Sequence, residues 1–334
     1  MLADITPTDI ISPPPRGRMG GGCSRFAPSP TGRMHLGNVF CALLSWLSAK
    51  SQGGKWRLRI EDLDPDRSRR DFALQLMDDL QWLGLPWDGE VVWQSQRSDI
   101  YEHYLKQLQD AGLTYPCYCT RADIMATQAP HETDGRIVYA GTCRGKKRDE
   151  TDKNKPAAIR LMVPDEVISF RDGHYGEQQV NLAEHCGDYV LRRQDGAWAY
   201  QLAVVVDDAL MGVTEVVRGR DLLLSTPQQI HLYRTFSSLS SPPKGGRGVS
   251  MGFEAPDYFH HPLLVNENGQ RLCKRDKSLD LSVLREKHHN PDEIVGFLAF
   301  LAGIIPEPTP SLPQDLLPLF SWKKVPKEDI TASL

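Results

Sequence analysis

Residues 25–38, RFAPSPTGRMHLGN, are the stretch from which the rest of this chain can be interpreted. Their apolar start reads as the end of a strand, and Pro28, Pro30 and Gly32 then force a loop. Residues 39–49 are apolar and numerous enough to form a buried helix. The sequence therefore predicts a strand, a tight loop and a helix, whose first N–H groups have no partner within the helix and form a ready anion site.

The four residues His35-Leu36-Gly37-Asn38 lie where this loop meets the helix. Gly37 lets a ligand approach the backbone, and His35 can donate a hydrogen bond to a phosphate oxygen. The run resembles the HIGH motif of the class I aminoacyl-tRNA synthetases, with Asn38 in place of the second histidine. Residues 58–64, LRIEDLD, resemble the glutamyl branch of that class. The resemblance implies ATP binding at His35, Gly37 and Asn38, with His35 catalytic; the alternative is a plain strand-to-helix turn.

A second nucleotide-binding element is expected at residues 271–275, RLCKR, which resemble the KMSKS loop of the same class. Lys274 matches the second lysine of that motif, Arg271 takes the place of the first, and Cys273 replaces the serine. A lysine on a mobile loop can neutralise charge on the departing pyrophosphate. The resemblance thus implies ATP binding by Arg271 and Lys274, with Lys274 catalytic. The alternative for these residues is a solvated basic loop.

Recognition of glutamate requires a cation for each carboxylate and an anion for the ammonium group, and the fork of an arginine suits a carboxylate. The resemblance assigns Glu61 to the ammonium group, and Arg25 with Tyr200 to the side-chain carboxylate. It places Arg218 near the other end of the substrate, although the division between the two arginines stays open. Tyr200 could instead be a core aromatic and Arg218 a surface charge. The full expected glutamate site consists of Arg25, Phe26, Ala27, Pro28, Ser29, Glu61, Tyr200 and Arg218.

Cys117, Cys119 and Cys143 form a candidate zinc site, because two cysteines so close on an irregular segment rarely serve packing. The resemblance implies Tyr139 as the fourth ligand of one structural Zn²⁺. The alternative is three free thiols in a reduced protein. The histidine pairs at 260–261 and 288–289 are predicted to lie on the surface rather than to bind metal.

The composition is that of a soluble globular protein, with 334 residues, 40% hydrophobic and 25% charged. No apolar run approaches the roughly 20 residues of a membrane span, so a membrane protein is not expected. Seven cysteines without a secretory signal predict a reducing, cytoplasmic location. The net charge of −4 does not favour nucleic-acid binding, although local patches steer binding more than total charge does. The basic runs 144–155 and 274–287 are candidate RNA-facing patches or simply solvated faces.

The predicted fold class is α/β, a class I synthetase Rossmann-like parallel sheet with an inserted zinc-bearing α+β subdomain and a short helical C-terminal stem. Strands are expected at 56–60 and, from a continuous apolar run, at 199–206; helices are expected at 71–83, 101–111 and 221–236. The expected order is a disordered tail (1–22), the first half of the catalytic domain (23–111), the zinc-binding, acceptor-like insertion (112–187), the second half (188–262, with a flexible insertion at 237–255), and the KMSKS-like loop with its helical stem (263–334).

The part after Lys274 is predicted to hold one or two helices, at 281–288 and 291–302, and a proline-rich end, which is too little for an anticodon-binding domain. The resemblance therefore narrows to the glutamyl-Q tRNA(Asp) synthetases, which activate glutamate without tRNA and then esterify the cyclopentenediol of queuosine at the wobble position of tRNA(Asp). It implies L-glutamate, ATP with Mg²⁺ and queuosine-bearing tRNA(Asp) as partners, and a monomer. Two alternatives stay open: a glutamyl-tRNA synthetase paralogue that charges the tRNA 3′ end, and a non-catalytic adenylate-binding protein.

Overall fold

The computed structural model describes residues 13, 21–126, 138–146, 155–240, 253–272, 280–287 and 289–332. Its centre is a parallel sheet in two groups. Strands β1 (Cys23–Phe26), β2 (Lys55–Ile60) and β3 (Val92–Trp93) form the first, and β9 (Glu215–Gly219) and β10 (Asp257–His261) begin the second. The groups meet where the backbone N–H of Thr214 donates to the carbonyl of Cys23, at 2.8 Å.

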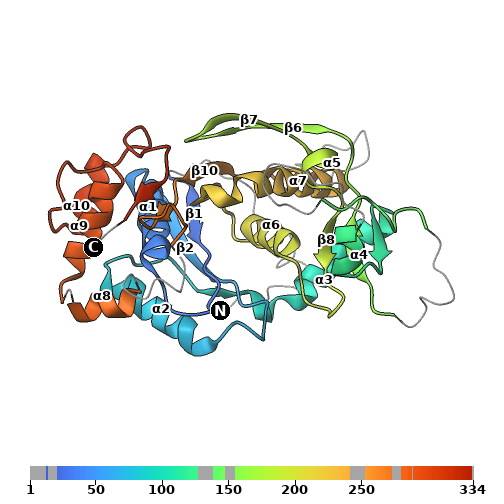
Figure 1. Ribbon diagram of the computed structural model, residues 1–334, viewed down its shortest axis with the longest axis horizontal. Coiled ribbons are helices and arrows are strands. Elements are labelled where there is room, and N and C mark those ends of the chain that lie inside the picture. The colour runs from blue at the N-terminus through green and yellow to red at the C-terminus, as the bar shows by residue number, and fades with distance from the viewer. Residues whose placement is uncertain are drawn as a thin grey trace, which may run out of the picture.

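Helix α1 (Leu36–Ser51) follows β1 and is buried along most of its length against both groups of strands (Figure 1). Helices α2 (Arg70–Trp82) and α3 (Ser98–Asp110) follow, and the short 3-10 helix η1 (Gln94–Gln96) leads into α3. The predicted strand–loop–helix unit around residues 25–49 is therefore confirmed, and so are the two helices after it.

The run 199–206 is not a strand but the start of α6 (Tyr200–Leu210), so the prediction at this point is wrong. Residues 202–209 are all buried, since α6 lies between α3, α7 (Thr226–Ser240) and the sheet. A helix buried on every side has the same unbroken apolar run as a buried strand, so the pattern alone could not separate them. Asp207 and Asp208, expected just past a strand, lie in the last turns of this helix.

The region from η3 (Arg220–Ser225) onward also differs from expectation. Helix α7 begins at Thr226 and runs to Ser240, four residues beyond the predicted end. At the far side of the expected flexible insertion, Phe253 is buried against Tyr104 and Phe236, so residues 253–255 belong to the folded body. Residues 241–252 lie outside the described part of the chain.

A separate antiparallel sheet, in the order β4 (Thr114–Cys117), β5 (Ala158–Leu161) and β8 (Tyr189–Arg192), combines strands of the predicted insertion (112–187) with residues that were expected to begin the second half of the catalytic domain. It lies at the opposite end of the molecule from the C-terminal helices (Figure 1). A hairpin of β6 (Val167–Asp172) and β7 (Gly176–Asn181) extends the second group of the central sheet, in the order β7-β6-β10-β9, because β6 pairs with β10 through Asp172 and Tyr258. The short helices α4 (Arg121–Ala126) and α5 (Leu182–His185) complete this region.

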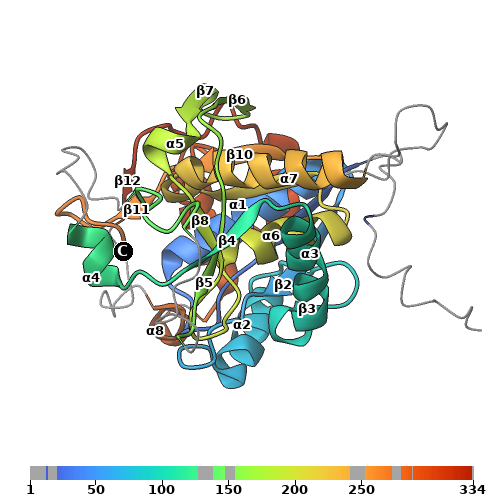
Figure 2. The ribbon, with the colours of Figure 1, turned by 90° about the vertical axis from the view of Figure 1, so that its right-hand side faces the viewer.

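The C-terminal part packs against α1 and α2 in one hydrophobic core. Its first helix lies near α2 in both ribbon views (Figure 1 and Figure 2). Strand β12 (Ile330–Thr331) returns to pair in parallel with β11 (Leu264–Val265). The helices of this part are α8 (Leu281–Lys287), α9 (Pro291–Leu301), α10 (Pro313–Leu316) and η5 (Leu317–Leu319). Among the helices of the described ranges, none is long and apolar enough to span a bilayer.

Candidate active site

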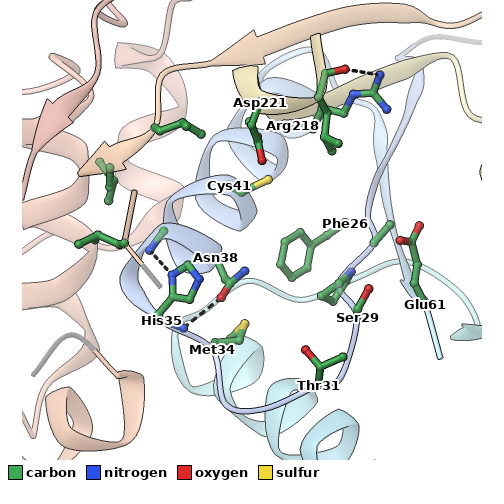
Figure 3. A pocket seen from close by; sticks show the side chains of 18 of the residues that line it. Phe26, Ser29, Thr31, Met34, His35, Asn38, Cys41, Glu61, Arg218 and Asp221 are labelled. Carbon is green, nitrogen blue, oxygen red and sulfur yellow. Dashed lines mark hydrogen bonds between the residues drawn. The ribbon is translucent and has the colours of Figure 1, made fainter. Parts of the chain in front are cut away.

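A cavity of about 480 Å³ opens at the carboxyl ends of β1, β2 and β9, where ligands bind in open α/β sheets. Figure 3 shows His35 and Asn38 on one side of it and Glu61 on another. All eight residues of the expected glutamate site line this one cavity, together with His35, Gly37, Asn38 and Arg271. Cys273 and Lys274 lie outside the described residues.

The N-terminus of α1 is closed by a reciprocal cap. Nδ1 of His35 accepts from the backbone N–H of Gly37 at 3.1 Å, and Oδ1 of Asn38 accepts from the backbone N–H of His35 at 3.1 Å. Because Nδ1 is an acceptor, the neutral ring carries its proton on Nε2 and can donate there. Asn38, which replaces the second histidine of the HIGH motif, therefore caps the helix together with His35.

Two residues that the sequence analysis did not select, Arg59 and Asp208, join the site residues into a buried network. Nε of Arg25 lies 3.2 Å from Oδ1 of Asp208, and Nη1 of Arg59 lies 2.5 Å from the same oxygen. Nη2 of Arg59 also lies 3.0 Å from Oε1 of Glu61. The side chains of Arg25, Arg59 and Asp208 are at most 4% exposed. One carboxylate therefore fixes both arginines, and Arg59 in turn fixes Glu61.

The protonation of this network follows from its arrangement. Burial would raise the pKa of Asp208, but Arg25 and Arg59 outweigh it and lower the pKa, so the carboxylate stays charged. Burial raises the pKa of Glu61, against the opposing effect of Arg59. Two signals in the sequence could have revealed the network. Arg59 is a charged residue within a predicted buried strand, and Asp207 and Asp208 end an apolar run; buried charges of this kind need partners.

Arg218, on β9, has a different environment. In the described part of the chain, no carboxylate lies within 4.0 Å of it. Its guanidinium instead donates to neutral acceptors, among them Oη of Tyr200 at 3.4 Å and Oε1 of Gln229 at 2.9 Å. Arg218 is only 4% exposed, so it is not the surface charge considered as an alternative. It is a buried cation whose charge is open to an anionic ligand.

The prediction that residues 260 and 261 lie on the surface is wrong. His260 and His261 are 0% and 3% exposed, because β10 is an inner strand of the sheet. Each has a hydrogen-bond partner in the protein: Nδ1 of His260 contacts Asp172, 88 residues earlier in the chain, and Nδ1 of His261 contacts the carbonyl of the adjacent Pro262. His289 is exposed, as predicted, and residue 288 lies outside the described part. Arg271 lines the cavity and forms an ion pair with Asp221.

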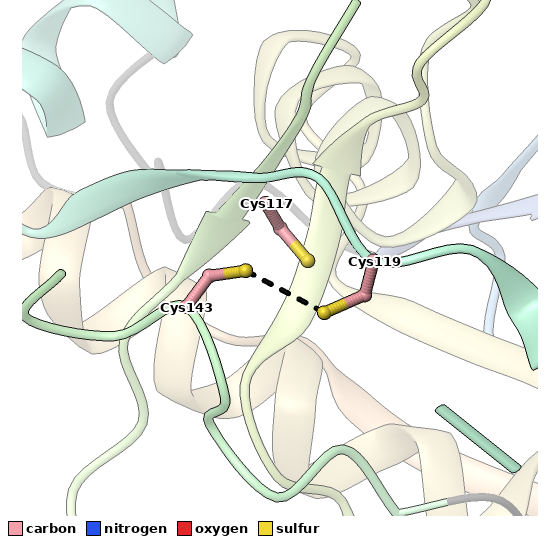
Figure 4. Close-up of side chains that lie close together, drawn as sticks. All are labelled: Cys117, Cys119 and Cys143. Carbon is pink, nitrogen blue, oxygen red and sulfur yellow. Dashed lines mark hydrogen bonds between the residues drawn. The ribbon is translucent and has the colours of Figure 1, made fainter. Parts of the chain in front are cut away.

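The four residues expected to bind zinc converge in the insertion. The sulfurs of Cys117, Cys119 and Cys143 lie within 4.8 Å of one another, and Cys119 and Cys143 are 3.5 Å apart (Figure 4). Oη of Tyr139 lies 3.3 Å from Sγ of Cys117 and 3.6 Å from Sγ of Cys119. Thiolates at the usual Zn–S length of about 2.3 Å in a tetrahedron are about 3.8 Å apart, so the arrangement fits a metal ion. Burial raises the pKa of Tyr139, which keeps the phenol protonated unless a cation binds.

Comparison with known proteins agrees with this geometry. A family model of the catalytic domain of class I tRNA synthetases (E and Q) matches residues 23–310. The chain is 45% identical over 317 residues to a glutamyl-Q tRNA(Asp) synthetase of Nitratidesulfovibrio vulgaris, which covers 90% of this chain and 93% of the relative. It is 44% identical over 322 residues to one of Symbiobacterium thermophilum, which covers 92% of this chain and 95% of the relative.

A solved structure extends the comparison to the fold. The glutamate-tRNA synthetase of Elizabethkingia anophelis matches with a TM-score of 0.76 at 28% identity, over 94% of this chain and 68% of that one. The expected class I synthetase fold with its parallel sheet is thereby confirmed. The matches identify the protein as a ligase: the chain belongs to the class I tRNA synthetases and, within them, to the family of the glutamyl-Q tRNA(Asp) synthetases.

Proposed function

We propose that the protein activates L-glutamate with ATP, without tRNA, and then transfers the glutamyl group to queuosine at the wobble position of tRNA(Asp). The observation that carries the proposal is the shared cavity, in which the N-terminus of α1 lies opposite a buried arginine without an ion pair within the described residues. The first element suits the phosphates of ATP and the second suits an acidic amino acid. The tRNA and its modified base are taken from the relatives, which are named as glutamyl-Q tRNA(Asp) synthetases.

The charges in the cavity indicate which of the two arginines contacts the side-chain carboxylate of glutamate, a question that the sequence left open. Arg25 is already paired with Asp208, whereas Arg218 forms no ion pair with any residue that the structure describes and contacts Tyr200. We therefore assign the side-chain carboxylate of glutamate to Arg218 and Tyr200, and the ammonium group to Glu61. Arg25 lines the same cavity, but Asp208 neutralises its charge.

The reaction then follows in two steps. An oxygen of the glutamate α-carboxylate attacks the α-phosphorus of ATP, the bond to the β-phosphate oxygen breaks, and pyrophosphate leaves. Nε2 of His35 and the positive end of the α1 dipole stabilise the phosphate charge, and Lys274 neutralises the leaving group. Mg²⁺ bound with ATP would supply further neutralisation. A queuosine hydroxyl next attacks the carbonyl carbon of the adenylate, and AMP leaves while the hydroxyl proton passes to solvent.

Glutamate-dependent ATP–pyrophosphate exchange, measured with and without tRNA, tests the first step. We expect exchange without tRNA and specificity for glutamate over glutamine and aspartate. Labelled glutamate is then offered to queuosine-bearing tRNA(Asp) that lacks its 3′-terminal adenosine. Continued labelling supports transfer to the anticodon loop. Labelling only of tRNA with an intact 3′ end favours an ordinary glutamyl-tRNA synthetase, and folded protein without exchange favours a non-catalytic nucleotide-binding protein.

We further propose that Cys117, Cys119, Tyr139 and Cys143 hold one structural Zn²⁺. Replacing Cys143 with serine is expected to lower the bound zinc, measured by native mass spectrometry, to below about a tenth of the wild-type content, because three protein ligands cannot complete the tetrahedral site. Cys186→Ser is the matched control, since Cys186 lies outside the sulfur cluster, and it should retain full zinc content. Wild-type protein without zinc, or undiminished zinc in Cys143→Ser, would contradict the assignment.

A further inference from the structure

The guanidinium of Arg218 is held on several sides by side chains that carry no charge. Nε donates to Nε2 of His260 at 3.0 Å, and Nη2 donates to Oγ1 of Thr226 at 2.8 Å. The contacts to Oη of Tyr200 and to the carbonyl of Leu222 are longer, at 3.4 Å each. Since hydrogen bonds weaken with distance, these two are the contacts that a bound carboxylate can most easily replace.

The contact with Arg218 fixes the tautomer of His260. A guanidinium can only donate, so Nε2 of His260 must be the unprotonated nitrogen. The ring proton is then on Nδ1 and is donated to Oδ2 of Asp172 at 2.6 Å. Burial lowers the pKa of His260 to about 4, so the ring is neutral near pH 7. The result is a fixed order of groups, in which a carboxylate, a neutral imidazole and a guanidinium follow one another.

Asp172 is itself immobilised at the end of β6. The carboxylate is 1% exposed and accepts from the backbone N–H groups of His174 at 3.0 Å and Tyr175 at 2.8 Å. The turn that provides these N–H groups is also bound to the C-terminal segment, because Oη of Tyr175 donates a hydrogen bond to the carbonyl of Lys327 at 2.7 Å. The orientation of the imidazole is therefore imposed by the hairpin of β6 and β7.

The two arginines of the cavity are thus held in opposite ways. Asp208 contacts Arg25 directly and neutralises it, whereas an imidazole separates Asp172 from Arg218. The imidazole orients the guanidinium through a hydrogen bond, the ring centre of Tyr258 lies 5.3 Å from it, and no carboxylate of the described residues lies within 4.0 Å of it. A buried charge in this state favours a ligand that carries the opposite charge over a neutral analogue.

We propose that His260 and Asp172 are positioning residues that orient Arg218 toward the side-chain carboxylate of glutamate and thereby set the selectivity for glutamate over glutamine. The inference rests on the proposed function, because it takes Arg218 as the group that contacts this carboxylate. His260 acts through Arg218, and Asp172 acts through His260 by holding its proton on Nδ1. An asparagine at 172 would present its amide N–H to Nδ1 of His260. This favours the tautomer with the proton on Nε2, whose N–H then points at the Nε–H of Arg218 and cannot accept from it.

The test is ATP–pyrophosphate exchange by wild-type protein and by the variants His260→Leu, His260→Gln and Asp172→Asn. We expect His260→Leu and Asp172→Asn to raise the KM for glutamate roughly 10- to 100-fold, as loss of a hydrogen bond to a charged group does. In the same two variants the ratio of kcat/KM for glutamate to kcat/KM for glutamine should decrease, while the KM for ATP stays within about twofold of wild type. His260→Gln places an oxygen near the position of Nε2 and should return the KM for glutamate to within about threefold of wild type.

His231→Leu is the matched control, since His231 lies on α7 and contacts Tyr189 rather than Arg218. It should leave the KM for glutamate and the selectivity unchanged. An unchanged KM for glutamate in His260→Leu and Asp172→Asn, or equal increases for glutamate and ATP, would overturn the inference. If His260→Leu does not fold, Asp172→Asn and His260→Gln decide the question. A wild-type protein without exchange overturns the proposed function itself, which is a separate result.

Discussion

Replacing Asp208 with alanine is expected to lower the free energy of unfolding by about 3–5 kcal/mol, the usual cost of removing one partner of a buried ion pair. Asp208 contacts both Arg25 and Arg59 within the network. After its removal Arg59 still has Glu61 at 3.0 Å, but Arg25 loses its ion pair with Asp208. Arg25 would then be a buried cation without an ion pair to any other residue in the described ranges. The same change should abolish glutamate-dependent exchange, because Arg25 and Glu61 both lose the arrangement that fixes them.

Urea unfolding followed by tryptophan fluorescence measures this effect. Asp110→Ala is the control, since Asp110 forms an ion pair with Lys106 in which both side chains are more than 60% exposed, at 64% and 69%. Exposed pairs of this kind contribute only about 0.3–0.5 kcal/mol. If Asp208→Ala lost no more stability than Asp110→Ala, the network would not have the structural role given to it here.

Replacing Arg218 with methionine is expected to separate function from stability. Methionine has a similar length and no charge, so kcat/KM for glutamate should fall about 10²- to 10³-fold as the carboxylate loses its cation. The free energy of unfolding should stay within about 1 kcal/mol of wild type or rise, because an apolar group replaces a buried charge. Arg218 therefore contrasts with Asp208, whose loss should damage both properties.

Exchange kinetics and urea unfolding of the same preparations provide the two measurements. Arg220→Ala is the matched control: Arg220 lies two residues further on, is exposed, and forms an ion pair with Asp329 outside the cavity lining. It should keep the wild-type KM for glutamate. A variant Arg218→Met that retains wild-type kcat/KM for glutamate would show that another residue binds the side-chain carboxylate.

The sequence was informative wherever local pattern determines local structure. The prolines and glycine of the loop and the apolar run after them were enough to predict β1, the loop and α1. All eight residues expected around glutamate line one cavity. The failure at 199–206 arose because burial on all sides removes periodicity, so that α6 resembles a strand. The failure at His260 arose because its partners, Asp172 and Arg218, come from distant segments. No local rule indicates that such a histidine will be buried between a carboxylate and a guanidinium.

The network around Asp208 also has a consequence for biosynthesis. Asp208 is 183 residues from Arg25 and 149 residues from Arg59 along the chain. On the ribosome, β1 and β2 therefore emerge long before the carboxylate that neutralises their arginines. Contacts between such distant segments form late and slow the folding of a chain. Arg25 and Arg59 of the first half cannot form their ion pairs with Asp208 until α6 has been synthesised. The substrate cavity can therefore be completed only after most of the protein has been made.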